Sequence, residues 1–418
     1  MHRNRVLFVV AIALAPSAAW PQGSPIGSEF RVNTYTTAAQ WHADVAADPA
    51  GNFVVVWDGT GEGDNTSGIF GQRFASSGAA LGAEFRVNTA TIAAQSAPSV
   101  AADSAGNFVV AWSSAGGYGG PPSDVFAQRY ASSGAPLGPE FRVNTFTTSS
   151  QLFVTVAAAA AGDFVVVWTG ALQDGSDVGV FGQRFASSGA PLGPEFRVNT
   201  STAGNQYFPS AAFDAAGNFV VVWASRVGYG ALPDVIGQRY ASGGTPVGPE
   251  FRINTFTTDG QTRPTVAAEP AGNFVVLWFG TGQGDSNGVF GQRFASSGAP
   301  LGPEFRVNTS TTDSQYLPSV AFDAAGGFVV AWNSSGGYGG ASPDVFGQRY
   351  ASDGTALGPE FRINTFSAGF QTRTALAAHP AGFVVIWDSY GQDGSGTAVF
   401  GQRFGPIVPV ELLDLRLE

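Results

Sequence analysis

The sequence contains no cysteine and no lysine. Without cysteine, the chain has neither a disulfide framework nor a thiolate metal site. All 20 basic residues are arginine and are outnumbered by 31 acidic residues, which gives a formal net charge of −11. Nucleic-acid phosphates require a basic surface, so this balance excludes nucleic acid as an expected partner.

Charged residues are also scarce, at 12% of the chain against 44% apolar residues. The apolar residues form short runs separated by glycine and proline, a pattern that predicts many short β-strands joined by turns. Intrinsic disorder is excluded because 34 Phe and 9 Trp supply ample apolar area for a core. No segment is long and apolar enough to predict a membrane span.

The N-terminus has the features of an export signal. His2, Arg3 and Arg5 form a basic start, residues 6–15 are apolar, and residues 16–19 are small enough for cleavage after Ala19. We therefore predict a signal peptide over residues 1–19. The expected product is a bacterial protein that is secreted to the extracellular space or retained in the periplasm.

One segment of about 55 residues recurs seven times, and each copy carries the marker Phe-Arg-(Val/Ile)-Asn-Thr. Successive markers lie 54 to 56 residues apart, and so regular a period indicates a repeat architecture. The markers begin at Phe30, Phe85, Phe141, Phe196, Phe251, Phe305 and Phe361.

Each repeat contains four strand-like pieces bounded by turn residues. In the second repeat they are residues 99–102, 108–112, 124–130 and 140–144. The Phe-Val-Val-x-Trp piece is apolar on both faces, which is typical of a strand packed between two sheets. Four strands in each of seven units predict an all-β protein, a seven-bladed β-propeller with four antiparallel strands per blade.

The two ends of the repeat region predict how the ring closes. An isolated strand-like piece at residues 29–33 precedes the first unit, and the last unit ends at residues 400–404 without a fourth piece. The N-terminal strand is therefore expected to complete the last blade, which removes the open sheet edges. The propeller would span residues 20–405, followed by a C-terminal tail over residues 406–418 that has no functional interpretation. A right-handed β-helix is the alternative fold, although its rungs are usually shorter.

The hairpin Val-Ala-Ala-Asp-x-x-Gly-Asn-Phe-Val-Val-x-Trp resembles those of secreted bacterial β-propeller repeats, and it is similar to the hairpins of the NHL and SBBP families. The resemblance covers residues 30–404 and implies the propeller fold, but it brings no catalytic motif. Three repeats depart from the pattern at the turn Asp position, where they carry Ala159, Glu269 and His379.

A Gln lies six residues after the Thr of every marker, and we expect these seven amides to satisfy loop backbone groups. The two residues after each Gln vary between repeats and are expected to surround the mouth of the central channel. Aromatic and Arg side chains there could stack on a sugar or hold an anion. The alternative is that they plug the mouth or pack between blades. The candidate ligand-binding residues are Trp41, His42, Phe153, Tyr207, Phe208, Arg263, Tyr316 and Arg373.

Two further groups of charged residues give weaker expectations. The Arg of the third strand, in Gln-Arg, and the Arg of the outer strand are expected to pair with a neighbouring Glu, such as Glu140 beside Arg142, or with a turn Asp. Acidic loops suggest calcium, but none has the Asp-x-Asp-x-Asp-Gly spacing, and solvated acidic loops are the alternative. These loops contain Asp58, Glu62 and Asp64, then Asp174 and Asp177, then Asp388 and Asp393.

No enzyme signature is present. Only His42 and His379 would follow the signal peptide, and no Gly-x-Ser-x-Gly elbow or sialidase Asp-box spacing occurs. The sequence favours a monomeric binding propeller without a cofactor, recognising a glycan or a cell-surface protein. One alternative is a hydrolase or lyase acting on an extracellular polysaccharide, which would need carboxylates converging in the channel mouth. The other is a purely structural exported repeat protein, whose channel mouth would be packed shut.

Overall fold

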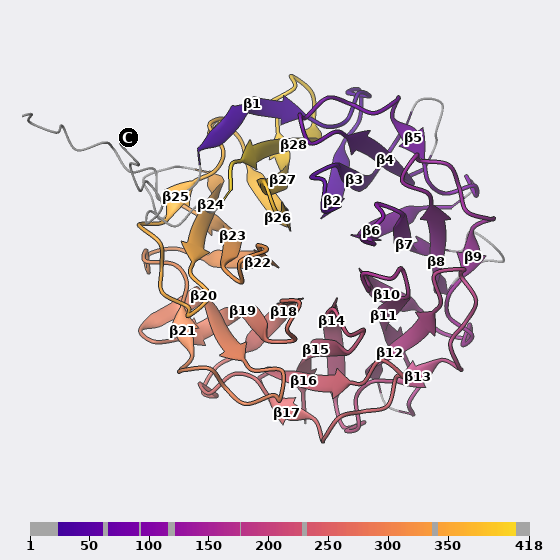
Figure 1. The fold of residues 1–418 in the computed structure, drawn as a ribbon, viewed down its shortest axis with the longest axis vertical. Helices are drawn as coiled ribbons and strands as arrows, with labels where there is room; N and C mark the ends of the chain where they lie inside the picture. Colours follow the sequence, from indigo (N-terminus) through magenta and orange to yellow (C-terminus); the bar gives the residue numbers. More distant parts are fainter. Residues whose placement is uncertain are drawn as a thin grey trace, which may run out of the picture.

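The computed structural model describes residues 24–61, 66–91, 93–115, 122–175, 177–227, 232–336 and 342–406. The predicted signal peptide lies outside these residues, as does the C-terminal tail beyond Pro406. The described residues form 28 β-strands arranged as seven blades around one axis (Figure 1). One bridge between Val178 and Asn205 joins the sheets of blades three and four.

Every blade is a four-stranded antiparallel sheet whose first strand lies nearest the axis (Figure 1). The innermost strands are β2 (Gln40–Ala47), β6 (Gln95–Ala102), β10 (Gln151–Ala158), β14 (Asn205–Phe213), β18 (Gln261–Ala268), β22 (Gln315–Phe322) and β26 (Gln371–His379). The second strands are β3 (Phe53–Gly59), β7 (Phe108–Ala115), β11 (Phe164–Ala171), β15 (Phe219–Arg226), β19 (Phe274–Gly282), β23 (Phe328–Ser335) and β27 (Gly382–Tyr390).

The two outer layers complete each blade. The third strands are β4 (Gly68–Phe74), β8 (Ser123–Tyr130), β12 (Val178–Phe185), β16 (Asp234–Tyr240), β20 (Asp285–Phe294), β24 (Pro343–Tyr350) and β28 (Thr397–Phe404). The outermost strands are β5 (Phe85–Arg86), β9 (Phe141–Arg142), β13 (Phe196–Arg197), β17 (Phe251–Arg252), β21 (Phe305–Arg306), β25 (Phe361–Arg362) and β1 (Pro25–Arg31). Except for β1, the outermost strands are two residues long, shorter than the five-residue pieces that the sequence predicted.

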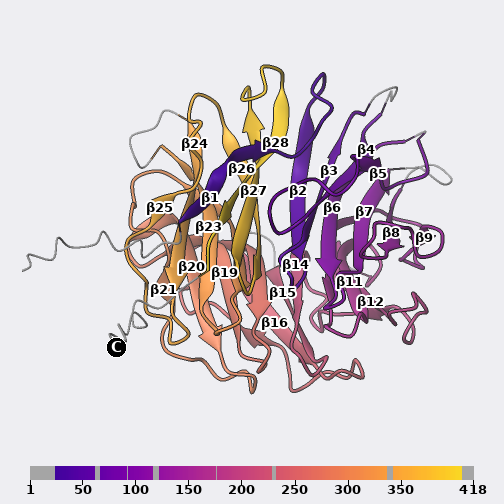
Figure 2. The same ribbon diagram turned by 45° about the horizontal axis from the view of Figure 1, so that its top comes forward.

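The chain closes the ring as predicted. Strand β1 pairs antiparallel with β28, and Phe30 lies opposite Gly401 (Figure 2). Beyond β1, the Val32 N–H donates to the Val399 carbonyl at 2.8 Å, and the Asn33 side-chain oxygen accepts the Val399 N–H at 2.8 Å. The propeller prediction is therefore confirmed, and the alternative β-helix is wrong because the two ends of the chain share one sheet.

The hydrophobic core lies between the blades. Seven clusters of buried apolar residues occur, and each combines side chains from two neighbouring blades. The cluster between the last and first blades contains Ala375 and Ile386 together with Val45 and Trp57. Seven blades with seven interfaces form a closed ring, and each blade depends on both neighbours for the burial of its apolar faces.

Polar contacts also join successive blades. The Arg73 guanidinium donates to the Ser132 carbonyl of the next blade at 2.6 Å, and Arg403 of the last blade reaches Ser76 of the first at 2.7 Å. The prediction for the outer-strand Arg is wrong for Arg142, which lies 3.8 Å from Asp124 on the neighbouring strand β8.

Glu140 has a different role from the one that the sequence suggested. Its carboxylate accepts the Thr89 N–H of the previous blade at 2.7 Å, so it does not serve Arg142. Glu84 and Glu304 accept the N–H groups of Thr34 and Thr255 at the same distance. The Glu before each marker therefore joins its blade to the Thr of the preceding marker. Sequence spacing could not reveal this contact because the two residues lie about one whole repeat apart.

Candidate binding site at the channel mouth

The innermost strand of every blade contains a β-bulge two residues after the repeated Gln. In β2, Trp41 lies opposite Asp58 and Asp44 lies opposite Val56, so three steps along β2 match two along β3. The second residue after each Gln has φ between 50° and 56°, a left-handed conformation that is rare outside glycine. These residues are His42, Ala97, Phe153, Phe208, Arg263, Leu317 and Arg373.

A buried Gln–Trp pair lies beside the bulge in six of the seven blades. In blade one, the Trp57 indole N–H donates to the Gln40 side-chain oxygen at 2.9 Å, and the Gln40 amide donates to the Ala38 and Thr60 carbonyls. Equivalent Trp-to-Gln bonds of 2.8–3.2 Å occur in blades two, three, five, six and seven. All seven Gln are buried, and each side-chain amide donates to a backbone carbonyl two or three residues earlier, which confirms that these amides satisfy loop backbone groups. The sequence analysis placed them in loops, whereas they lie at or next to the start of the innermost strands.

The seven bulge residues surround a cavity of about 960 Å³ at the axis. All seven line it, together with Tyr316, Thr372 and small polar residues of the innermost strands such as Ser99 and Thr155. A left-handed residue costs on the order of 1 kcal/mol, and structures tolerate such strain mainly where the surroundings determine it and where function requires a fixed direction. The repeated bulge therefore directs one variable side chain per blade toward a common space.

One wall of the cavity is aromatic. Phe153 and Phe208 meet edge to face with ring centres 4.5 Å apart, and Tyr207 packs against Phe208 at 5.0 Å. Phe153 is 45% exposed although it is a large apolar side chain. The Arg263 guanidinium lies over the Phe208 ring at 4.4 Å. An exposed aromatic surface beside a cation is suited to stacking on a sugar ring.

A second wall, from blades seven and one, is charged. The His42 Nδ1 lies 2.6 Å from the Asp58 carboxylate, which also accepts the Ala97 N–H at 3.0 Å. Asp388 accepts the backbone N–H of His42 at 3.0 Å and lies 4.0 Å from the Arg373 guanidinium. His42 is thus oriented by two carboxylates, one on its side chain and one on its backbone.

These carboxylates differ in their exposure. Asp58 and Asp388 are buried behind the bulge residues and do not line the cavity, whereas Asp44 does. Burial raises the pKa of Asp388 to about 7, although Arg373 and the His42 N–H oppose the shift. Burial also raises the pKa of Asp44, whose oxygens accept the Val45 and Val100 N–H groups at 2.9 Å. Backbone hydrogen bonds therefore hold Asp58 and Asp388 behind the mouth and hold Asp44 at the cavity wall.

The sequence-predicted residues fall into two sets. His42, Phe153, Phe208, Arg263, Tyr316 and Arg373 line the cavity. Trp41 and Tyr207 are not among the lining residues but support those that are, since Arg373 lies over the Trp41 ring at 5.6 Å. Burial raises the pKa of the Tyr316 phenol, which also bonds to Thr372. Ligand binding by any of them stays a prediction.

The sequence analysis missed the position of the carboxylates. Asp58 and Asp388 directly follow the repeated Trp and were expected in acidic loops, either solvated or binding calcium, but both are strand residues that bond to backbone N–H groups. Of the other loop residues, Asp174 accepts a bond from Asn199, and Glu62 and Asp64 lie outside the described residues. Within the described ranges, no group of three or more His, Asp or Glu is arranged to hold a metal ion.

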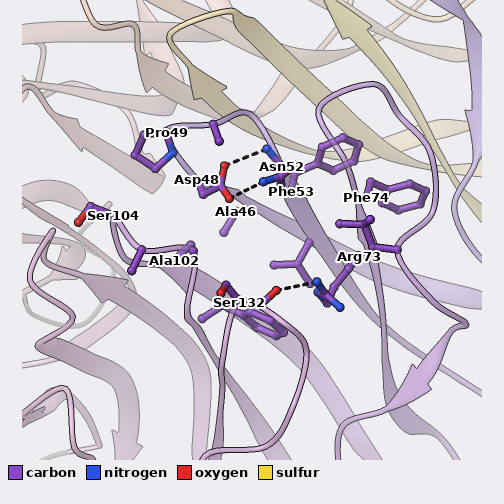
Figure 3. Close-up of a pocket in the computed structure, with 16 residues that line it drawn as sticks. Ala46, Asp48, Pro49, Asn52, Phe53, Arg73, Phe74, Ala102, Ser104 and Ser132 are labelled. Carbon is purple, nitrogen blue, oxygen red and sulfur yellow. Dashed lines mark hydrogen bonds between the residues drawn. The ribbon is translucent and has the colours of Figure 1, made fainter.

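The opposite face of the ring carries the nearly uniform turns, and a groove of about 380 Å³ lies there between blades one and two (Figure 3). Asp48 accepts two bonds from Asn52 at 2.8 and 2.9 Å, and Arg73 reaches the Ser132 carbonyl of the next blade (Figure 3). A groove with the same residue types recurs between blades four and five. Repetition and internal satisfaction of these polar groups indicate a scaffold role.

No protein-family model matches the sequence, and no curated protein matches it. Solved structures do match. A protein of unknown function from Dyadobacter fermentans has a TM-score of 0.56 at 10% identity, and the match covers 92% of this chain and all of that one. The polysaccharide lyase Uly1 has a TM-score of 0.52 at 9% identity, covering 93% of this chain and 94% of that one.

A third similar structure is the β-propeller domain of the Trilobed protease from Pyrococcus furiosus, which has an open velcro topology. Its TM-score is 0.51 at 8% identity, with 92% of this chain and all of that chain covered. At these identities the likeness shows the β-propeller fold alone. The present chain differs from that open topology because β1 closes the last blade. No helix among the described residues has the length and apolar character needed to cross a bilayer.

Proposed function

We propose that this chain is an exported binding propeller that recognises a glycan at the channel mouth. The observation that carries the proposal is the ring of seven left-handed residues, which share one backbone conformation but carry five different kinds of side chain. A uniform scaffold that displays varied aromatic and cationic groups around one cavity is an arrangement suited to recognition.

The open cavity distinguishes glycan binding from two alternatives, a purely structural repeat protein and recognition of a cell-surface protein. A purely structural repeat would need no open mouth, and a cavity of about 960 Å³ with exposed Phe153 counts against it. A cell-surface protein would offer a flat or convex surface, whereas the recessed ring with an aromatic wall suits a narrow chain of sugar rings better. A glycan is therefore the preferred partner.

The first prediction concerns the aromatic wall. Phe208→Ala is expected to weaken glycan binding about two- to tenfold, because an aromatic contact contributes about 0.5–1.5 kcal/mol. The fold should tolerate the change, since Ala97 occupies the equivalent left-handed position in blade two. The measurement is a glycan array with wild type, Phe208→Ala and the triple variant Trp41→Ala, Tyr207→Ala, Tyr316→Ala. Phe370→Ala, which removes an exposed aromatic side chain outside the cavity lining, is the control. Equal signals for all the proteins, or none for any, would contradict the proposal.

One observation favours a second function, cleavage of an extracellular polysaccharide. His42 lines the cavity, and the buried Asp58 carboxylate 2.6 Å away orients its ring, an arrangement typical of a general base. The base would be His42 because Asp58 and Asp388 are buried behind the mouth. A hydrolase that uses two exposed carboxylates is less well supported.

The second prediction separates cleavage from binding. If the propeller is an enzyme, wild type releases new reducing ends from a polysaccharide, and His42→Ala lowers that rate by at least about a hundredfold. Ala97 again provides a precedent for alanine at this backbone position. Asp58→Ser, which copies Ser113 of blade two, should reduce the rate less because it leaves the imidazole in place. Binding by wild type with no release of ends would exclude the enzymatic function.

A further inference from the structure

Two arginines occupy equivalent places in the ring. Arg263 is the bulge residue of blade five and Arg373 that of blade seven, and both line the cavity with only the apolar Leu317 of blade six between them in ring order. Both have left-handed backbones, so their entry directions are fixed by the scaffold. The ring thus presents two guanidinium groups toward one space in a protein whose formal net charge is −11.

Neither guanidinium is fully neutralised by the protein. Within the described part of the chain, no acidic residue forms an ion pair with Arg263, whose observed contact is the Phe208 ring. Burial and repulsion from Arg373 both lower the pKa of Arg263. Arg373 lies 4.0 Å from Asp388, at the limit of an ion pair, and Asp388 already accepts the N–H groups of His42 and Ala43.

The acidic side chain that lines the cavity, Asp44, accepts hydrogen bonds from backbone N–H groups. Asp44 accepts the Val45 and Val100 N–H groups at 2.9 Å and belongs to blade one, outside blades five to seven, and burial raises its pKa. The mouth is therefore locally positive on the side of blades five to seven. An oxyanion near both arginines would relieve their mutual repulsion and accept hydrogen bonds from their N–H groups. The planar guanidinium group matches a carboxylate in shape.

The sugar-stacking wall lies beside these cations, since Arg263 covers the Phe208 ring at 4.4 Å and Phe208 meets Phe153. A ligand that satisfies both surfaces has an apolar ring face and a carboxylate on the same unit. We propose that the ligand is an acidic saccharide whose uronate carboxylate is held by Arg263 and Arg373 while its ring lies against Phe153 and Phe208. This inference rests on the proposed glycan-binding function.

Calorimetric titration tests the charge of the ligand. The probes are a galacturonate oligosaccharide, a neutral galactose oligosaccharide of equal length and a sulfated galactose oligosaccharide. Wild type is expected to bind the galacturonate probe at least about tenfold more tightly than the neutral one, and added salt should weaken only the acidic interaction. Arg263→Gln and Arg373→Gln are each expected to remove about tenfold of that affinity. The control Arg252→Gln, on the outermost strand β17, removes the same charge away from the mouth and should change nothing.

The outcomes distinguish this inference from the function on which it rests. Equal affinity for acidic and neutral probes, with no effect of either arginine substitution, would overturn the acidic-ligand inference and leave glycan binding standing. Tighter binding of the sulfated probe would overturn the carboxylate assignment. Failure of every saccharide probe would overturn the proposed function itself. The salt dependence of the affinity of wild type for the galacturonate probe tests for an ionic contact even if a variant fails to fold.

Discussion

Deletion of residues 24–33 is expected to lower the free energy of unfolding by about 5 kcal/mol or more and to open the ring. Val32 is buried, and Phe30 packs against Phe53 and Phe74 of the first blade with ring centres 6.1 and 5.4 Å away. Their apolar burial contributes about 2 kcal/mol each, and the lost Val399 backbone bonds about 1 kcal/mol each.

Urea denaturation of the deleted and intact proteins measures this loss. The added synthetic peptide for residues 24–33 is the control, because it should restore part of the stability by pairing again with β28. Proteolysis should cut the deleted protein first in the last blade, whose outer edge is then unpaired. Unchanged stability and protease resistance would mean that β1 does not close the ring.

The change in unfolding free energy caused by Asp388→Asn is expected to be more favourable to the folded protein at pH 8 than at pH 4. Burial raises the pKa of Asp388 from 3.8 to about 7, so the folded protein holds a proton that the unfolded chain has already released. The contribution of Asp388 to the free energy of unfolding is therefore greatest below about pH 4. It declines as the pH rises and becomes constant above about pH 7. The full pKa shift of Asp388 corresponds to about 4 kcal/mol. Asn does not titrate, so the substitution removes this pH dependence.

The fold should accept this substitution because blade six carries Asn333 at the equivalent position, where its amide donates to the Gln371 carbonyl at 3.2 Å. The side-chain oxygen of the introduced amide could still accept the His42 N–H. The measurement is the difference in unfolding free energy between variant and wild type from pH 4 to pH 8, which cancels the titrating groups that do not interact with Asp388. A difference that does not change with pH would contradict a raised pKa.

The architecture could be predicted from the sequence because every repeat gives the same signal. The isolated marker at residues 29–33 identified the closing strand, and the Phe-Val-Val-x-Trp pieces identified strands that are buried on both faces. The variable pair after each Gln correctly indicated the channel mouth, and at least one member of every pair lines the cavity. These inferences needed only strand order and repeat number.

The geometry of the site could not be predicted. The bulge depends on the bond between Gln40 and Trp57, 17 residues later, and the residue types at the left-handed positions carry no common signal, as Ala97 and Arg263 show. The strand register at the bulge places Asp58 opposite Trp41. The sequence does not reveal this register, so Asp58 was predicted to begin an acidic loop. Contacts between blades, such as that of Arg73 with Ser132, require the curvature of the ring.

The most direct test of the account that the channel mouth binds an acidic glycan is a crystal structure of the protein soaked with a galacturonate oligosaccharide. The account predicts density at the channel mouth, with a sugar ring against Phe153 and Phe208 and a carboxylate within hydrogen-bond distance of Arg263 and Arg373. Density in the grooves of the opposite face, or a mouth that stays empty at saturating ligand, would contradict it.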